Sequence, residues 1–177
     1  MIYSTNSNLL VPNKIQTVIC WTPAKYKMKE SDVMAIFNEY KKQLIKKLGK
    51  HVTDNTQLEK IAFPLIGSRF KGVYAQDTLP VNKNGMYVMN NQKSNRGGEH
   101  WVAIVITTKR IYVWDSFGRN TKSLLTLLTK KAKDAKKTIV DADYDAEQNI
   151  NTAVCGPLSL AWLLTVKQVG IANALKV

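Results

Sequence analysis

Four residues, in the chain order His100, Asp115, Gln148 and Cys155, carry the side chains that acyl transfer needs. A thiol can act as the nucleophile and an imidazole as the general base. A carboxylate can orient the imidazole, and a side-chain amide can donate a hydrogen bond to an oxyanion. The set indicates the chemistry of a cysteine hydrolase, provided that the fold brings the four side chains together.

Cys155 stands at the start of a long apolar segment. Gly156 and Pro157 follow it, and residues 158–166 are apolar almost throughout. Proline fits the first turn of a helix, so we expect a buried helix that begins near Cys155. The positive end of that helix, with a nearby imidazolium, would lower the pKa of the thiol. Taken alone, Cys155 could equally be a small buried hydrophobe.

His100 precedes a predicted strand, 101–107, and Asp115 ends the next one, 111–115. Residues 107–110 are few enough to form an antiparallel hairpin, which would place the two side chains near the same end. Asp115 would then accept a hydrogen bond from the Nδ1–H of His100. The alternatives are a structural histidine and a turn-forming aspartate.

Gln148 precedes Cys155 by seven residues, in a polar loop at 145–149. Its amide and the backbone N–H of Cys155 could together bind an oxyanion. The alternative is an ordinary solvated loop residue.

The remaining pattern predicts a single α+β domain over residues 1–177, with a central, mostly antiparallel sheet packed against helices. A helix capped by Ser31 or Asp32 should run to Gly49, since apolar residues recur at helical spacing between them. Further predicted elements are strands at 61–66, 86–89 and 138–141 and a helix at 121–133, which carries Leu124, Leu125, Leu127 and Leu128 on its buried side.

Composition indicates a soluble globular protein. The chain has 177 residues, 45% of them hydrophobic, and no apolar stretch long enough to span a bilayer, so no membrane partner is expected. Cys20 and Cys155 could form at most one disulfide, and the first residues lack a signal peptide pattern. We therefore expect a reducing, intracellular setting, with Cys20 packed in a core.

The net charge of +13 is the second global feature. Such an excess of positive charge suits a phosphate backbone and modestly favours non-specific DNA binding. Solvated lysine-rich helix faces would explain each cluster of lysines alone about as well. The clusters are Lys41, Lys42, Lys46, Lys47 and Lys50, and Lys130, Lys131, Lys133, Lys136 and Lys137.

The motifs in combination resemble one family. Gly-Gly-x-His-Trp at 97–101, Asp-Ser-Phe-Gly at 115–118, and Gln148 seven residues before a Cys-Gly pair resemble the adenovirus-type (adenain-like) maturation proteases. These share a papain-like fold with the ubiquitin-like-protein proteases. Residues 70–80 are similar to a segment in related proteases of large DNA viruses, virophages and Polinton-like elements. The resemblance covers about residues 62–165.

The resemblance implies that His100 is general base and acid, Asp115 its orienter, Cys155 the nucleophile and Gln148 an oxyanion donor. Trp101 and Gly98 would contact the substrate, with Trp101 narrowing the approach for small residues next to the scissile bond. A core aromatic is the equally weighted alternative for Trp101. The family's activating peptide is tethered by a cysteine between the triad residues, and this chain has none there. A disulfide-linked activator is therefore not expected.

The expected function is that of a cysteine endopeptidase that processes virion precursor proteins, such as capsid proteins, near small residues. No metal and no required cofactor are expected, and an activating role for DNA or a peptide is left open. The expected location is the host cytoplasm or a viral factory, with packaging in the virion. The alternatives are a protease that removes a ubiquitin-like modifier and a non-catalytic, basic DNA-binding scaffold on the same fold.

Overall fold

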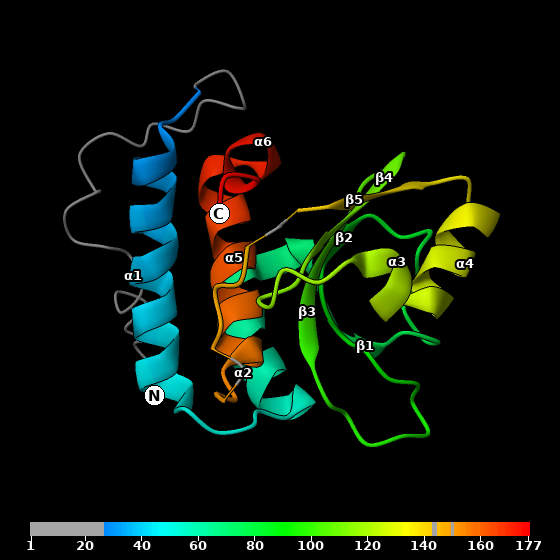
Figure 1. The fold of residues 1–177 in the computed structure, drawn as a ribbon, viewed down its shortest axis with the longest axis horizontal. Coiled ribbons are helices and arrows are strands. Elements are labelled where there is room, and N and C mark those ends of the chain that lie inside the picture. The colour runs from blue at the N-terminus through cyan, green and yellow to red at the C-terminus, as the bar shows by residue number, and fades with distance from the viewer. Residues whose placement is uncertain (1–26, 143–144, 150) are drawn as a thin grey trace, which may run out of the picture.

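The computed structural model describes residues 27–142, 145–149 and 151–177, and Cys20 lies outside them. Within these residues the fold is α+β, with a five-stranded sheet packed against helices (Figure 1). The helices are α1 (Glu30–Leu48), α2 (Asn55–Ile66), α3 (Thr121–Leu124), α4 (Thr126–Asp134), α5 (Cys155–Val169) and α6 (Ile171–Ala174), with a 3-10 turn at Gly67–Arg69. The strands are β1 (Phe70–Ala75), β2 (Gly85–Asn90), β3 (Trp101–Ile106), β4 (Arg110–Trp114) and β5 (Thr138–Asp141).

The strands lie in the order β1-β2-β3-β4-β5. The inner pairs β2–β3 and β3–β4 are antiparallel, whereas the outer pairs β1–β2 and β4–β5 are parallel. The prediction of a mostly antiparallel sheet is therefore wrong, and the sheet is mixed. The parallel pairing of β4 and β5 has a plain cause, because α3 and α4 lie between them in the chain and provide the crossover that parallel neighbours need.

Both faces of the sheet are covered, and α5 lies between α1 and the sheet (Figure 1). Residues alternate along β2 and β3, so that Val88 and Ala103 face α5 while Met89 and Ile104 join the cluster on the other face, which includes Leu128 of α4. This double burial makes the central strands almost wholly apolar.

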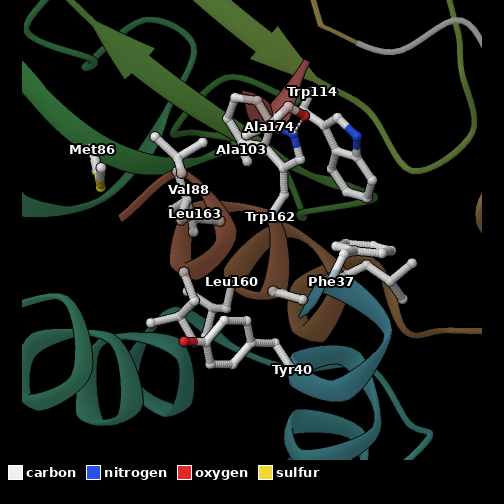
Figure 2. Close-up of a cluster of buried hydrophobic side chains, with 14 of the residues drawn as sticks. Phe37, Tyr40, Met86, Val88, Ala103, Trp114, Leu160, Trp162, Leu163 and Ala174 are labelled. Carbon is white, nitrogen blue, oxygen red and sulfur yellow. Dashed lines mark hydrogen bonds between the residues drawn. The ribbon is translucent and has the colours of Figure 1, made fainter. Parts of the chain in front are cut away.

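The apolar contacts of α5 are aromatic as well as aliphatic (Figure 2). Trp162 is fully buried, stacks on Trp114 of β4 at 6.2 Å between ring centroids, and donates from Nε1 to the carbonyl of Ala174 at 3.1 Å. Phe37 of α1 meets the same Trp114 edge-on at 5.6 Å. The prediction of a central, buried helix that begins at Cys155 is confirmed. Among the described residues, no helix is long and apolar enough to span a membrane.

One predicted strand is wrong. Residues 61–66 belong to α2, which begins with a capping box: Asp54 accepts from the backbone N–H of Gln57 at 2.8 Å, and the Gln57 side chain accepts from the backbone N–H of Asp54 at 3.0 Å. From this cap, Leu58, Ile61 and Ile66 all fall on the buried side. A short apolar run fits a strand and a buried helix equally well, and here the upstream cap decides for the helix.

Smaller differences concern the ends of elements. The first helix begins at Glu30, with Lys29 at its N-cap, so neither Ser31 nor Asp32 is the cap. It ends before Gly49, as predicted, where φ is +84°. The helix predicted over 121–133 is broken at Leu125, which is itself fully buried under the sheet. Strand β1 had no predicted counterpart, and strands β2 to β5 agree with the predictions to within about one residue.

The two lysine clusters lie at opposite ends of the molecule, one on α1 and just after it and the other on and after α4 (Figure 1). The side chain of Lys131 is already engaged in hydrogen bonds within the protein, because its Nζ donates to the carbonyls of Asp77 at 2.9 Å and Leu79 at 2.6 Å. Lys137 likewise donates to the carbonyl of Thr107. The clusters therefore do not form one continuous surface.

The α5 packing predicts a large cost for removing Trp162. Trp162→Ala should lower the free energy of unfolding by about 3–5 kcal/mol, because it leaves a cavity against Trp114 and an unpaired carbonyl at Ala174. Leu175→Ala is the control, since Leu175 is 38% exposed, and its cost should stay below about 1 kcal/mol. Urea unfolding followed by circular dichroism measures both, and equal costs would contradict the packing role.

Candidate active site

The hairpin of β3 and β4 brings His100 and Asp115 together, as predicted. His100 directly precedes β3 and Asp115 directly follows β4, and the antiparallel register places Ala103 opposite Trp114. The Nε2 atom of His100 lies 2.6 Å from Oδ1 of Asp115, and both side chains are buried. The predicted contact through Nδ1 is wrong: Nε2 faces the carboxylate, which leaves Nδ1 for the thiol.

The Asp115 carboxylate is held from three directions. Besides His100, the backbone N–H of Phe117 donates to Oδ1 at 3.1 Å, and Nε of Arg119 donates to Oδ2 at 2.8 Å. Burial raises the pKa of Asp115, but hydrogen bonds from His100 and Arg119 outweigh it and leave the pKa below its ordinary value. The carboxylate is therefore ionised and fixed in orientation.

Cys155 opens α5 and forms a hydrogen bond with the side chain of His100. Burial raises the pKa of the thiol, but the bond to His100 and the backbone N–H groups of Trp101 and Gly156 lower it overall. Burial lowers the pKa of His100, whereas its bonds to Asp115 and Cys155 raise it overall. The two opposite shifts favour a thiolate–imidazolium pair, the reactive form of a catalytic cysteine.

Two contacts dock the first turn of α5 beside His100. The Oγ of Ser159 donates to the carbonyl of Trp101 at 3.2 Å. A Cβ added to Gly156 would lie 2.1 Å from Oγ1 of the buried Thr53, so glycine is needed for the helix to approach this closely. The chain around Cys155 is thus packed against the segment before α2 as well as against β3.

Gln148 is buried, which excludes the alternative of a solvated loop residue. Its backbone N–H donates to the carbonyl of Ser116 at 2.9 Å. The Ser116 hydroxyl donates to Oε1 at 2.7 Å, and Nε2 donates to the carbonyl of Thr152 at 2.6 Å. With Oε1 occupied by a donor, the second N–H of the amide is left for an acceptor in the cavity.

His100, Gln148 and Cys155 line one cavity of about 580 Å³, together with Trp101 and Gly98. Trp101 is half-buried: its Nε1 donates to the carbonyl of Thr53 at 2.8 Å, and the ring packs on the core while it lines the cavity. Both descriptions weighed for Trp101, core aromatic and cavity wall, therefore apply. All six residues predicted for the site lie at this cavity or, in the case of Asp115, directly behind it.

Several residues of the site were not predicted from the sequence. Arg119 holds Asp115, and Ser116 holds Gln148. The ring of Phe117 packs against that of His100 at 5.0 Å between centroids. Arg119 also lies over the Phe117 ring at 4.8 Å. Their position next to Asp115 in the chain was the available signal, since residues that follow a catalytic strand end often contact the site.

Within the described residues, no group of three or more His, Cys, Asp or Glu side chains is placed to hold a metal ion. In comparisons with known proteins, no family model matches the chain, and no curated protein matches it significantly. The resemblance to the adenovirus-type proteases therefore rests on the motifs alone.

The electrostatics of the pair predict how Cys155 reacts with iodoacetamide. Thiolate forms as the pH rises through the lowered pKa of Cys155, so the wild-type protein should be alkylated readily at pH 7. His100→Ala removes the hydrogen bond and the positive charge, which raises the thiol pKa and should slow alkylation at pH 7 by about tenfold or more. Mass spectrometry of the Cys155 peptide measures the rate. His51→Ala is the matched control, and equal rates in the two variants would contradict the pairing.

The ion pair between Arg119 and Asp115 predicts a pH-dependent loss of stability. Because the pKa of Asp115 is lowered in the folded protein, its contribution is present above the unfolded pKa and is lost as the pH falls through the folded pKa. Arg119→Gln should therefore cost up to about 1 kcal/mol at pH 7, with a smaller difference at pH 3. Arg110→Gln, at the other end of β4, is the control. A cost that does not change with pH would show that Arg119 acts by packing alone.

Proposed function

We propose that this protein is a cysteine endopeptidase in which Cys155 is the nucleophile. The observation that carries the proposal is the linked set Cys155–His100–Asp115, with a lowered thiol pKa and a raised imidazole pKa, at an open cavity. A buried structural cysteine would have its pKa raised by burial and would need no such partners. Gln148 lines the same cavity and would complete the set as a hydrogen-bond donor.

In the proposed mechanism the Cys155 thiolate attacks the scissile carbonyl carbon, and a C–S bond forms. The oxyanion accepts hydrogen bonds from Nε2 of Gln148 and the backbone N–H of Cys155. The His100 imidazolium then protonates the leaving amine as the C–N bond breaks. Neutral His100 next takes a proton from water, which attacks the thioester and releases the carboxylic acid and the thiolate. Asp115 stays ionised throughout and stabilises the imidazolium.

The proposed fold family is the papain-like fold of the ubiquitin-like-protein proteases. It is supported by a central helix that begins at the cysteine and by histidine and aspartate at adjacent strand ends. The motif resemblance extends the proposal to a viral maturation protease that cuts virion precursor proteins, such as capsid proteins, near small residues. Such an enzyme would act in the host cytoplasm or viral factory and be packaged in the virion.

Two alternatives use the same fold. A protease that removes a ubiquitin-like modifier would need the same four side chains and would differ only in cleaving an isopeptide bond after Gly-Gly. A scaffold that binds DNA through its lysines would need none of them. Non-specific DNA binding stays a prediction from charge, and it must be tested on two separate surfaces, α1 and α4, because the lysines do not gather on one face.

The test is cleavage of denatured virion proteins and of a peptide library, with products identified by mass spectrometry. The wild-type protein should cut internal peptide bonds, and Cys155→Ala should cut none, while Cys20→Ser serves as the matched thiol control. Gln148→Ala should lower kcat by on the order of 10²–10³ with little change in KM, because the contact strengthens in the transition state.

Three outcomes would change the proposal. A loss confined to KM would make Gln148 a substrate-binding residue. Cleavage of Gly-Gly isopeptides alone would favour the modifier protease. Cleavage by Cys155→Ala at a near wild-type rate would overturn the nucleophile.

A further inference from the structure

A second cavity, of about 320 Å³, adjoins the catalytic one. The two share Asn55, Gly98 and Trp101 as lining residues, so they meet at these three residues. Gly98 has no side chain at this junction, and a Cβ there would lie 2.4 Å from Nδ2 of Asn90. Asn90 is itself buried, and its Oδ1 accepts from the backbone N–H of Gln92. A larger residue at 98 would therefore displace a fixed neighbour.

The two cavities differ in charge. Lys93 and Arg96 are the only charged residues that line the second cavity, and among the described residues neither forms an ion pair. The catalytic cavity is lined by two carboxylates, Asp54 and Glu99. Its other charged groups are paired, Arg119 with Asp115 and the His100 imidazolium with the Cys155 thiolate. An acidic side chain would therefore be disfavoured close to Cys155 and favoured in the second cavity.

The loop that carries these cations is anchored. Asp77 accepts from the backbone N–H of Ser94 at 2.8 Å and from its hydroxyl at 2.6 Å. The backbone N–H of Arg96 donates to the carbonyl of Lys93 at 3.0 Å, which closes a turn. Lys93 and Arg96 are thus presented from one fixed turn. The carboxylate of Asp77 beside this turn is engaged with Ser94, and that of Glu99 accepts from Nε2 of Gln92 at 2.7 Å.

The position of the second cavity along the sheet sets its distance from the scissile bond. The second cavity lies at the ends of β1 and β2, at Ala75 and Asn90, whereas His100 and Asp115 lie at β3 and β4. Two strand spacings amount to about 10 Å, and an extended peptide covers this distance in about three residues. A peptide that crosses these strand ends would reach both cavities.

We propose that the second cavity is a substrate subsite for an acidic side chain, Glu or Asp, about three residues from the scissile bond, which Lys93 and Arg96 bind. This rests on the proposed function as a peptidase and specifies its substrates.

The test compares peptides that carry Glu or Gln at each of the five positions on either side of a cleaved bond. At one position two to four residues from the bond, kcat/KM should be on the order of fivefold higher for Glu, and the preference should shrink in 0.5 M salt. The double variant Lys93→Gln with Arg96→Gln should bring the Glu-to-Gln ratio to about one. The matched control is Lys83→Gln with Lys109→Gln. It removes two exposed charges near the opposite ends of the strands and should leave the Glu-to-Gln ratio unchanged.

The outcomes separate the two proposals. Cleavage without a Glu preference, or with a preference that survives in the Lys93/Arg96 variant, overturns the subsite and leaves the peptidase intact. If no peptide is cleaved, the peptidase proposal fails. Selection of a peptide library on Cys155→Ala then decides the subsite: enrichment of Glu and Asp that disappears in the Lys93/Arg96 variant supports it, and no enrichment overturns it.

Discussion

The burial of α5 between α1 and the sheet is the constraint on which the site depends. Trp162 and its apolar neighbours on α5 cannot be withdrawn from the core without exposing several large side chains, so the helix axis is fixed. The first residue of that helix is Cys155, and its place beside His100 follows from the packing of the fourteen residues after it. The Cys155 thiol is thus held in place by hydrophobic contacts that lie far from it along α5.

Electrostatics adds a second level to this arrangement. Burial alone would neutralise Asp115, His100 and Cys155, because each loses solvation. Instead, Arg119 stabilises the carboxylate of Asp115, and that carboxylate stabilises the imidazolium of His100. The imidazolium in turn stabilises the thiolate of Cys155. The chain of contacts shows why a buried carboxylate, an imidazolium and a thiolate can coexist, and why the loss of one member is expected to affect the others.

The features that the sequence did not predict share a physical cause. Residues 61–66 form a short apolar run, which carries no period of its own and fits a strand as well as a helix. The capping box several residues upstream is the signal that decides for the helix. Strand β1 was missed because Gly72 and a shift in register interrupt its pattern. The nitrogen of His100 that meets Asp115 depends on the direction from which the carboxylate arrives, which no local pattern contains.

The sequence itself determined the chain order of the four candidate site residues. It also determined the helix that begins at Cys155 and the hairpin that joins His100 to Asp115. Periodicity, a proline after the cysteine and a short loop are local signals, because they act between residues that are close in the chain. Tertiary structure alone decided the parallel outer strands, the burial of Gln148 against Ser116, the pairing of Arg119 with Asp115 and the separation of the two lysine clusters. Each of these features depends on how elements that are distant in the chain are oriented relative to one another. The sequence pattern states which residues are near in the chain, but not which side chains point toward one another.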